Sequence, residues 1–337
     1  MKAWVVRAPG GFDRLEIVER DDPGVPAPGE IRVAIHATSL NFHDLLVANG
    51  GIPAADGRVL MADGAGVVEA VGLGVTEFAP GDHAVSTFFP HWPAGAPFDA
   101  VGNFAGTPGD GIDGMATTHV VRAATAFTRA PAGWSHAEAA TITTAGLTAW
   151  RALVVDGGLR AGATVLIMGT GGVSIAALQI AKAMGATVIA TSSSGAKRER
   201  LTALGADHTL DYREMPEWGA AVRDLTGGLG VDHVVEIGGP GTLPQSIAAV
   251  RVGGHIALIG VLTGREGQVP TMELMRKQAR LQGLIVGSRR DQQDYVTALE
   301  VTGIRPVIDR SFAFEELADA FRYQLSGAHF GKICAEW

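Results

Sequence analysis

Short apolar runs separated by turn-forming residues fill the first third of the chain. The β-branched segments 31–35 and 66–71 are typical of strands. Pro-Gly or Gly-Gly pairs mark turns beside them, at 9–11, 28–29 and 80–81. This pattern predicts a β-rich, barrel-like domain at this end of the chain.

After about residue 134 the pattern changes to alternating strands and helices. Residues 135–138 have the Ser-x-x-Glu form of a helix capping box. Strands that alternate with helices predict a parallel sheet with right-handed crossovers. The predicted strands are 164–168, 187–191, 231–236 and 255–260, the predicted helices among them are 173–184 and 196–204, and the tail from residue 288 holds a helix, a strand at 305–308 and a helix at 314–325.

Composition favours a folded protein of two domains. The chain has 337 residues, of which 47% are hydrophobic and 18% charged, and a domain usually holds about 100 to 200 residues. The formal net charge of −8 argues against nucleic-acid binding. A single cysteine, Cys334, excludes an internal disulfide and any zinc site built from several cysteines.

The chain carries no signal for export or membrane insertion. Residues 1–8 lack the apolar segment of a signal peptide. A run of about eighteen apolar residues, as a membrane span needs, is absent from the sequence. We therefore expect a cytoplasmic protein without membrane contact.

The strongest motif is Gly-Thr-Gly-Gly-Val-Ser at 169–174, between a predicted strand and a predicted helix. A dinucleotide pyrophosphate must approach the backbone closely and face a helix N-terminus, so side chains must be absent at the turn. Gly169, Gly171 and Gly172 meet this demand, and Ser174 is small enough for helix–strand packing. Cofactor contacts are predicted at Gly169, Thr170, Gly171, Gly172 and Val173.

The end of the second predicted strand favours NADPH over NADH. An NAD site places Asp or Glu there to bind the ribose 2′-hydroxyl, but this chain has Ser192, Ser193 and Ser194, followed by Lys197 and Arg198. Hydroxyls and positive charge suit a 2′-phosphate. The alternative is a solvated turn that only caps the next helix.

Together these stretches resemble the medium-chain dehydrogenase/reductase superfamily, and in particular its zinc-independent, quinone oxidoreductase-like branch. The resemblance extends over nearly the whole chain. Its motifs are Asp-Gly-Ala-Gly-Val-Val-Glu-Ala-Val-Gly at 63–72, Pro-Gly-Asp-His-Ala-Val at 80–85, Ala-Gly-Leu-Thr-Ala-Trp at 145–150, the glycine motif at 169–174, Leu-Gly-Ala-Asp-His at 204–208 and His-Phe-Gly-Lys at 329–332.

The resemblance implies an α/β protein of two domains. A GroES-like β-barrel catalytic domain would comprise residues 1–123 and 288–337. A Rossmann domain with a doubly wound parallel sheet would comprise residues 124–287, and the active site would lie in the cleft. The resemblance also implies a homodimer or higher homo-oligomer.

Zinc-dependent alcohol dehydrogenases of the same superfamily carry a Cys after the second strand, a Gly-His-Glu sequence, and a further Cys or Asp before the Rossmann domain. By the resemblance, the corresponding places in this chain are held by other residue types: Asn41, Met61-Ala62-Asp63, and Thr143 or Thr144. Asp63 alone cannot hold a catalytic zinc ion, which needs three protein ligands. We therefore predict that no metal is bound.

Without a metal, hydride transfer is easiest to an acceptor that is already electrophilic, such as a quinone or an α,β-unsaturated carbonyl. The acceptor oxygen still needs hydrogen-bond donors. Asn41, His43 and Thr144 are the predicted catalytic residues, and His43 takes the place of the proton relay of zinc relatives. A purely structural His43 at a helix start is the alternative.

The segment from about 90 to 115 has no periodicity and is predicted to be a pocket-covering loop. Phe88, His91 and Trp92 are the predicted substrate-binding residues, because a flat conjugated acceptor suits aromatic neighbours. The alternative is that these rings pack the loop against the barrel.

The resemblance also implies cofactor contacts outside the glycine motif. Thr148 and the backbone of Gly260 and Val261 would touch the nicotinamide, while Tyr212 would lie near the adenosine ribose phosphate. Ile237, Arg289 and Lys332 complete the predicted set, with a solvated side chain as the alternative for the last two.

The predicted function is that of a zinc-independent, NADPH-dependent oxidoreductase that acts on a small quinone or conjugated carbonyl. One alternative is an alcohol or aldehyde dehydrogenase of the same superfamily. The other is a non-catalytic NADPH-binding protein.

Overall fold

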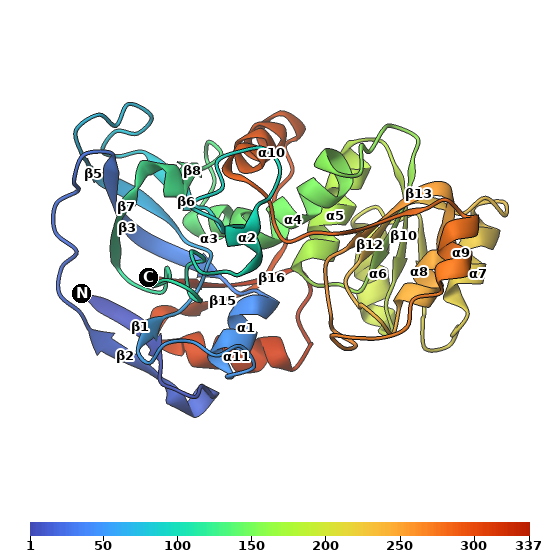
Figure 1. The fold of residues 1–337 in the computed structure, drawn as a ribbon, viewed down its shortest axis with the longest axis horizontal. Coiled ribbons are helices and arrows are strands. Elements are labelled where there is room, and N and C mark those ends of the chain that lie inside the picture. Colours follow the sequence, from blue (N-terminus) through green and yellow to red (C-terminus); the bar gives the residue numbers. More distant parts are fainter. The chain divides into compact units, whose positions relative to one another are not determined.

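The computed structural model describes the whole backbone of residues 1–337 and every side chain except that of Ala100. The chain forms two compact units (Figure 1). The first unit comprises Met1–Leu147 and Val286–Trp337, and the second comprises Thr148–Ile285.

The first unit is rich in β structure. A sheet of seven strands has the order β15-β16-β3-β5-β6-β8, with β7 also paired to β3, and a three-stranded sheet has the order β2-β1-β4. The strands are β1 (Lys2–Val6), β2 (Leu15–Glu19), β3 (Glu30–Ser39), β4 (Arg58–Val59), β5 (Ala65–Val71), β6 (His83–Ser86), β7 (His119–Ala123), β8 (Phe127–Arg129), β15 (Ile308–Ala313) and β16 (Lys332–Glu336).

The C-terminal segment is part of this first unit because β16 pairs antiparallel with β3, with Ala335 opposite Thr38. Ser288 is the N-cap of α10, and its hydroxyl accepts a hydrogen bond from the Asp291 amide, while Gly303 follows the helix as its C-cap in the left-handed conformation (φ +68°). The helices of the unit are α1 (Phe42–Ala48), α2 (Asp99–Gly102), α3 (His136–Ala140), α10 (Arg289–Thr302) and α11 (Leu317–Leu325).

The second unit holds a six-stranded parallel sheet of order β11-β10-β9-β12-β13-β14. This is the strand order of a doubly wound dinucleotide-binding fold, in which the order reverses between the first and fourth strands. The elements are β9 (Thr164–Met168), α5 (Gly172–Ala183), β10 (Thr187–Thr191), α6 (Gly195–Ala203), β11 (His208–Leu210), α7 (Trp218–Leu225), β12 (Val231–Glu236), α8 (Leu243–Ala249), β13 (Val250–Leu258), α9 (Thr271–Arg276) and β14 (Arg280–Gly283), while α4 (Leu147–Trp150) crosses from one unit to the other.

Both faces of the parallel sheet are buried. Leu166 and Met168 of β9 pack with Trp218 of α7 and Ile247 of α8. Alternate residues of a strand point to opposite faces, so Val165 and Ile167 face the other side, where α5 packs against β9. The predicted α/β architecture, with a β-rich domain and a doubly wound parallel sheet, is therefore confirmed.

Several details differ from the prediction. Residues 124–147 belong to the first unit and not with the parallel sheet, because β8 pairs with β6. The tail strand begins at Ile308, where the prediction ended. The predicted loop contains the short helix α2, and the predicted strand 255–260 is the end of the longer β13. No helix in the described part of the chain combines the length and the hydropathy of a membrane span.

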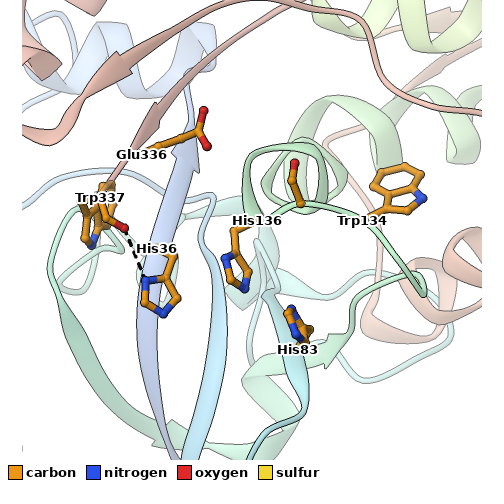
Figure 2. Close-up of a pocket in the computed structure, with 7 residues that line it drawn as sticks. His36, His83, Trp134, His136, Glu336 and Trp337 are labelled. Carbon is orange, nitrogen blue, oxygen red and sulfur yellow. Dashed lines mark hydrogen bonds between the residues drawn. The ribbon is translucent and has the colours of Figure 1, made fainter.

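Three imidazole rings are stacked on the surface of the first unit (Figure 2). His136 lies between His36 and His83, with ring centroids 4.8 and 4.9 Å away. The three rings come from α3, β3 and β6 and line a pocket with Glu336. Burial, together with positive charge on the two neighbouring rings, lowers the pKa of His136 to about 4, and Glu336 opposes this effect.

This stack predicts that the first unit loses stability in mild acid. Between pH 6.5 and about 4, the unfolded chain binds a proton at His136 that the folded chain does not bind, so the free energy of unfolding falls as the pH falls. In His136→Gln the loss of Tm between pH 7 and 5 should be smaller by about 2 °C. Thermal scans at both pH values test this, with exposed His208→Gln as the control; equal losses in all three proteins would contradict it.

Candidate functional site

The glycine turn of the second unit has the shape of a phosphate site. Strand β9 ends at Met168, and Gly169 follows in the left-handed conformation (φ +69°), which favours glycine. A Cβ atom at Gly171 would meet nothing within 4 Å, so open space lies in front of this backbone. Ser174 donates a hydrogen bond to the Met168 carbonyl (2.6 Å) and holds α5 against β9. The N-terminus of α5 therefore faces a space that fits a dinucleotide phosphate.

All the predicted cofactor residues that follow strands of the second unit lie at one edge of its sheet. The strands are parallel, so their carboxyl ends share that edge, where doubly wound folds bind ligands. These residues are Gly169, Thr170, Gly171, Gly172 and Val173 after β9, Ser192, Ser193, Ser194 and Lys197 after β10, Tyr212 after β11, Ile237 after β12, and Gly260 and Val261 after β13.

Side-chain hydroxyls from the turns after β10 and β11 lie next to each other. The Tyr212 hydroxyl donates a hydrogen bond to the Ser193 hydroxyl (3.2 Å), and Tyr212 is 39% exposed. Ser194 caps α6 by accepting a hydrogen bond from the Lys197 amide (3.4 Å). The turn is thus both a helix cap and a polar surface at the carboxyl edge.

Arg198 is not available to a ligand in the way the sequence indicated. Its guanidinium donates to the Ser192 carbonyl (2.9 Å) and forms an ion pair with Asp211. Hydrogen bonds from the Arg213 amide and from Arg198 lower the pKa of Asp211. The carboxylate at the end of β11 therefore offsets this positive charge.

Glu236 was missed by the sequence analysis, although it shapes this edge. It ends β12 and is fully buried. One carboxylate oxygen accepts hydrogen bonds from the amides of Gly238 (2.7 Å) and Gly239 (2.9 Å) and from the Thr242 hydroxyl (2.6 Å). The other accepts one from the Ser246 hydroxyl. An acidic residue two positions before a glycine pair was the available signal for this role.

The loops after β12 and β13 are tied together. A Cβ atom at Gly260 would lie 1.9 Å from the Ile237 carbonyl oxygen, so only glycine permits this approach. The Thr263 hydroxyl donates to the Gly238 carbonyl (2.8 Å) and accepts from the Gly241 amide (2.8 Å). The carboxyl edge is therefore a connected structure rather than a set of separate loops.

In the first unit, the predicted catalytic residues surround a buried carboxylate. Asp63 is fully buried and accepts hydrogen bonds from the hydroxyls of Ser39 (2.5 Å) and Thr144 (2.5 Å). The Lys332 ammonium lies 3.7 Å from Asp63 and donates to Asn41 Oδ1 (2.5 Å). Burial raises the pKa of Asp63, and the positive charge of Lys332 opposes the rise.

Asn41 and Thr144 direct their hydrogen atoms into the protein. Asn41 is the N-cap of α1, and its amide nitrogen donates to the Ser39 carbonyl (3.2 Å) and to Asp44 (3.1 Å). Thr144 donates to Asp63 from a π-helical turn. These bonds differ from the prediction that both residues donate to a substrate oxygen, because nearby acceptors of the same unit already bind the hydrogens.

The same residues do not match the ligand set of a catalytic zinc ion. The Asp63 carboxylate is engaged by two hydroxyls and lies beside an ammonium, which would repel a cation. Asn41 Oδ1 accepts a hydrogen bond from the same ammonium. Across the described residues, no three His, Cys, Asp or Glu side chains form a group that could hold a metal ion.

His43 lies in an aromatic setting. It is the second residue of α1, its ring is stacked on Phe104 (centroids 5.0 Å apart), and it meets Phe88 edge to face (5.5 Å). Nε2 lies 3.1 Å from a carboxylate oxygen of Asp110, a residue that the sequence analysis did not single out. The signal there was an acidic residue inside an aperiodic, glycine-rich loop.

The predicted substrate-binding residues differ in exposure. Phe88 and Trp92 are 2% and 1% exposed and pack together with Phe89, whereas His91 is exposed. The Trp92 indole donates to the Gly95 carbonyl (3.1 Å). Phe88 and Trp92 therefore pack within the first unit, and a contact of these residues with a substrate stays a prediction.

Arg289 and Lys332 are engaged within the first unit, so neither has the solvated side chain of the alternative interpretation. Arg289 Nη2 donates to both carboxylate oxygens of Glu77 (2.5 and 2.6 Å), and Nε donates to the Phe127 carbonyl (2.8 Å). Lys332 is 5% exposed. Thr148 lies in α4, where the chain enters the second unit.

Known proteins match both units. Residues 27–132 match the family model for the alcohol dehydrogenase GroES-like domain, and residues 172–302 match that for zinc-binding dehydrogenases. A zinc-type alcohol dehydrogenase-like protein of Schizosaccharomyces pombe is 39% identical over 96% of this chain and 95% of its own length.

Solved structures agree. An NAD-dependent alcohol dehydrogenase is 36% identical, with a TM-score of 0.90 and all of both chains covered. A quinone oxidoreductase of Pseudomonas syringae is 27% identical, with a TM-score of 0.83, covering 100% of this chain and 99% of its own. The expected GroES-like and Rossmann domains are thereby confirmed.

Because Glu236 holds the loops of the carboxyl edge, we expect its substitution to lower both stability and nucleotide affinity. Glu236→Gln introduces an amide donor where the chain supplies only donors, so unfolding should become easier by about 1–3 kcal/mol. The loops should also bind a dinucleotide about tenfold more weakly, because a loss near 1.4 kcal/mol has that effect. Urea unfolding and a fluorescence titration with NADPH measure both changes. Glu217→Gln, at an exposed residue with a single amide partner, is the control; a Glu236 variant that matches it would contradict the assignment.

Proposed function

The chain belongs to the medium-chain dehydrogenase/reductase superfamily, and we propose that it is a zinc-independent reductase that uses NADPH to reduce a quinone or an α,β-unsaturated carbonyl. The superfamily consists of NAD(P)-dependent oxidoreductases that act on small molecules. The acceptor class, the preference for NADPH and the independence of zinc are the parts that we add.

The Lys332 ammonium carries the metal-free part of the proposal. It lies buried between Asn41 Oδ1 and Asp63, at the place where the zinc enzymes of the superfamily have metal ligands. A cation at this place would have to displace a fixed positive charge and two hydroxyl hydrogen bonds. Ammonium and hydroxyl groups thus replace the ligand set.

A conjugated acceptor follows from this site. With no Lewis acid to polarise an isolated carbonyl, the acceptor must be electrophilic by conjugation. Charge then develops on its oxygen, and that charge needs a proton donor. Asn41 and Thr144 direct their hydrogens to the protein, so we assign the donor role to His43.

The preference for NADPH rests on the turn after β10. Ser193 and the Tyr212 hydroxyl face each other there, Lys197 is near in the first turn of α6, and no carboxylate occupies the end of the strand. The Asp211 carboxylate, which follows β11, is paired with Arg198. A 2′-phosphate would receive hydroxyl donors and positive charge here.

The chain's own residues would divide the work as follows. The glycine turn at 169–172 would hold the pyrophosphate, and the loops after β12 and β13 would hold the nicotinamide end. Bound NADPH supplies the hydride. His43 would give a proton to the reduced oxygen and regain one from water.

The homodimer that the resemblance implies is part of the proposal. Strand β14 is the edge strand of the parallel sheet, where a second copy could extend it. We expect light scattering after gel filtration to give the mass of at least two chains, and a single-chain mass at micromolar concentration would contradict a dimer.

Turnover in the presence of a chelator tests the proposed function. With EDTA present and oxygen excluded, the enzyme should oxidise NADPH when a simple para-quinone or a 2-enone is added, and plasma emission analysis should find no stoichiometric zinc. If activity disappears with chelation and returns with zinc, the protein is a metal-dependent alcohol dehydrogenase. If NADPH binds without turnover on any acceptor, the protein is a non-catalytic binder.

Lys197 tests the cofactor preference separately. In Lys197→Ala, kcat/KM for NADPH should fall about tenfold while that for NADH changes less than about twofold, because one charged hydrogen bond to a phosphate contributes near 1.4 kcal/mol. Lys182→Ala, at a surface lysine paired with Asp207, is the matched control. Equal losses with both nucleotides would exclude a 2′-phosphate contact.

A further inference from the structure

His43 and Asp110 form a pair that is largely withdrawn from water. Their closest atoms, Nε2 and Oδ2, are 3.1 Å apart, and the side chains are only 16% and 14% exposed. The contact has the distance of an ion pair, but Nε2 makes no hydrogen bond to any described residue, so its N–H direction does not point at the Asp110 oxygen. The carboxylate therefore lies against the Nε2 edge of the imidazole.

Aromatic rings fix the orientation of His43. Phe104 lies against one face of the imidazole, with an interplanar angle of 30°, and Phe88 meets it at 77°. Phe104 itself has a φ of +57°, a conformation that aromatic residues rarely adopt. Strain of this kind persists where the surroundings impose it, so the stacking on His43 is a built feature of this loop.

A rigid turn holds Asp110. The Gly109 amide donates to the Ile112 carbonyl (2.9 Å), and the Ile112 amide donates to the Thr107 carbonyl (3.1 Å). A Cβ atom at Gly109 would lie 2.8 Å from the backbone nitrogen of Met61, so the turn is pressed against the chain just before Asp63. The carboxylate therefore reaches His43 on a short, cross-braced loop.

We propose that Asp110 is a positioning residue that holds His43 as the proton donor of the reaction. Asp44, the neighbouring carboxylate on α1, accepts hydrogen bonds from the backbone amides of Asn41 (3.0 Å) and Ala62 (2.9 Å) and so is engaged elsewhere. Phe88 and Phe104 carry no charge. With Nε2 facing Asp110, Nδ1 is the nitrogen that gives its proton away.

The step balances without a further reactant. The acceptor takes a hydride with both electrons from bound NADPH, and its oxygen becomes negatively charged. The Nδ1–H bond of His43 then breaks as the new O–H bond forms. Neutral His43 remains beside Asp110 and takes a proton from water before the next turnover. This inference rests on the proposed function for the acceptor, for NADPH as the source of the hydride and for His43 as the proton donor.

A double-mutant cycle tests whether Asp110 acts through His43. Asp110→Asn should lower kcat about tenfold with KM changed less than about twofold, since a positioned acid or base contributes on the order of a hundredfold. In a His43→Gln background, the same substitution should change kcat less than about twofold. Independent, multiplying effects would overturn the proposal, as would an Asp110 variant with normal kcat. Asp99→Asn, at an exposed carboxylate of the same segment, is the control, and Asp110→Ser replaces the first variant if that one fails to fold.

A second readout does not need turnover. In crystal structures, the His43 ring should be turned or disordered in Asp110→Asn and keep its position in Asp99→Asn. An ordered, unmoved His43 ring in Asp110→Asn would overturn the inference even if the enzyme is active. A displaced ring in a protein that reduces no acceptor would uphold the positioning by Asp110 and refute the proposed function.

Discussion

The burial of one ammonium group determines much of the first unit. Removing Lys332 from water is costly unless acceptors replace its hydration. They come from separate elements: the Leu40 carbonyl after β3 (2.7 Å), Asn41 Oδ1 at the start of α1, and Asp63 before β5. Strand β16, which carries Lys332, is thereby fixed against the region that the sequence predicted to be catalytic. The orientation of Asn41 and Thr144 follows from the same network, because Lys332 donates to Asn41 Oδ1 and Asp63 accepts from the Thr144 hydroxyl.

The second unit solves a similar problem without a positive partner. Glu236 is as buried as Asp63, but amide and hydroxyl donors surround it. These donors satisfy both buried carboxylate oxygens without adding net charge. As a result, hydrogen bonds to Glu236 hold the loop after β12, and Gly260 of the loop after β13 lies close against the backbone of Ile237. A nucleotide would thus meet backbone rather than long side chains.

The sequence predicted elements that depend on local pattern. Strand β10 matches its prediction, α5 and α6 lie within one residue of theirs, and the capping box at Ser135 is present. The cofactor edge followed because parallel strands bring distant turns together by topology alone. The contacts that the sequence did not predict depend on partners far along the chain. Arg289 pairs with Glu77, and Lys332 with Asn41, and no local pattern indicates either pairing. For the same reason, the sequence did not decide whether Phe88 and Trp92 line a substrate pocket or pack in the core.

Direction of hydrogen bonding was the least predictable property of the site. A threonine hydroxyl can donate or accept, so the residue type alone does not say whether Thr144 supplies a proton to a substrate. The buried carboxylate at 2.5 Å decides this, since an ionised Asp63 can only accept. The oxygen of Thr144 is then an acceptor for whatever binds beside it. A site built this way has inward-facing donors that hold the scaffold. In the reaction that we propose, the proton therefore comes from the imidazole that lies against the Asp110 carboxylate.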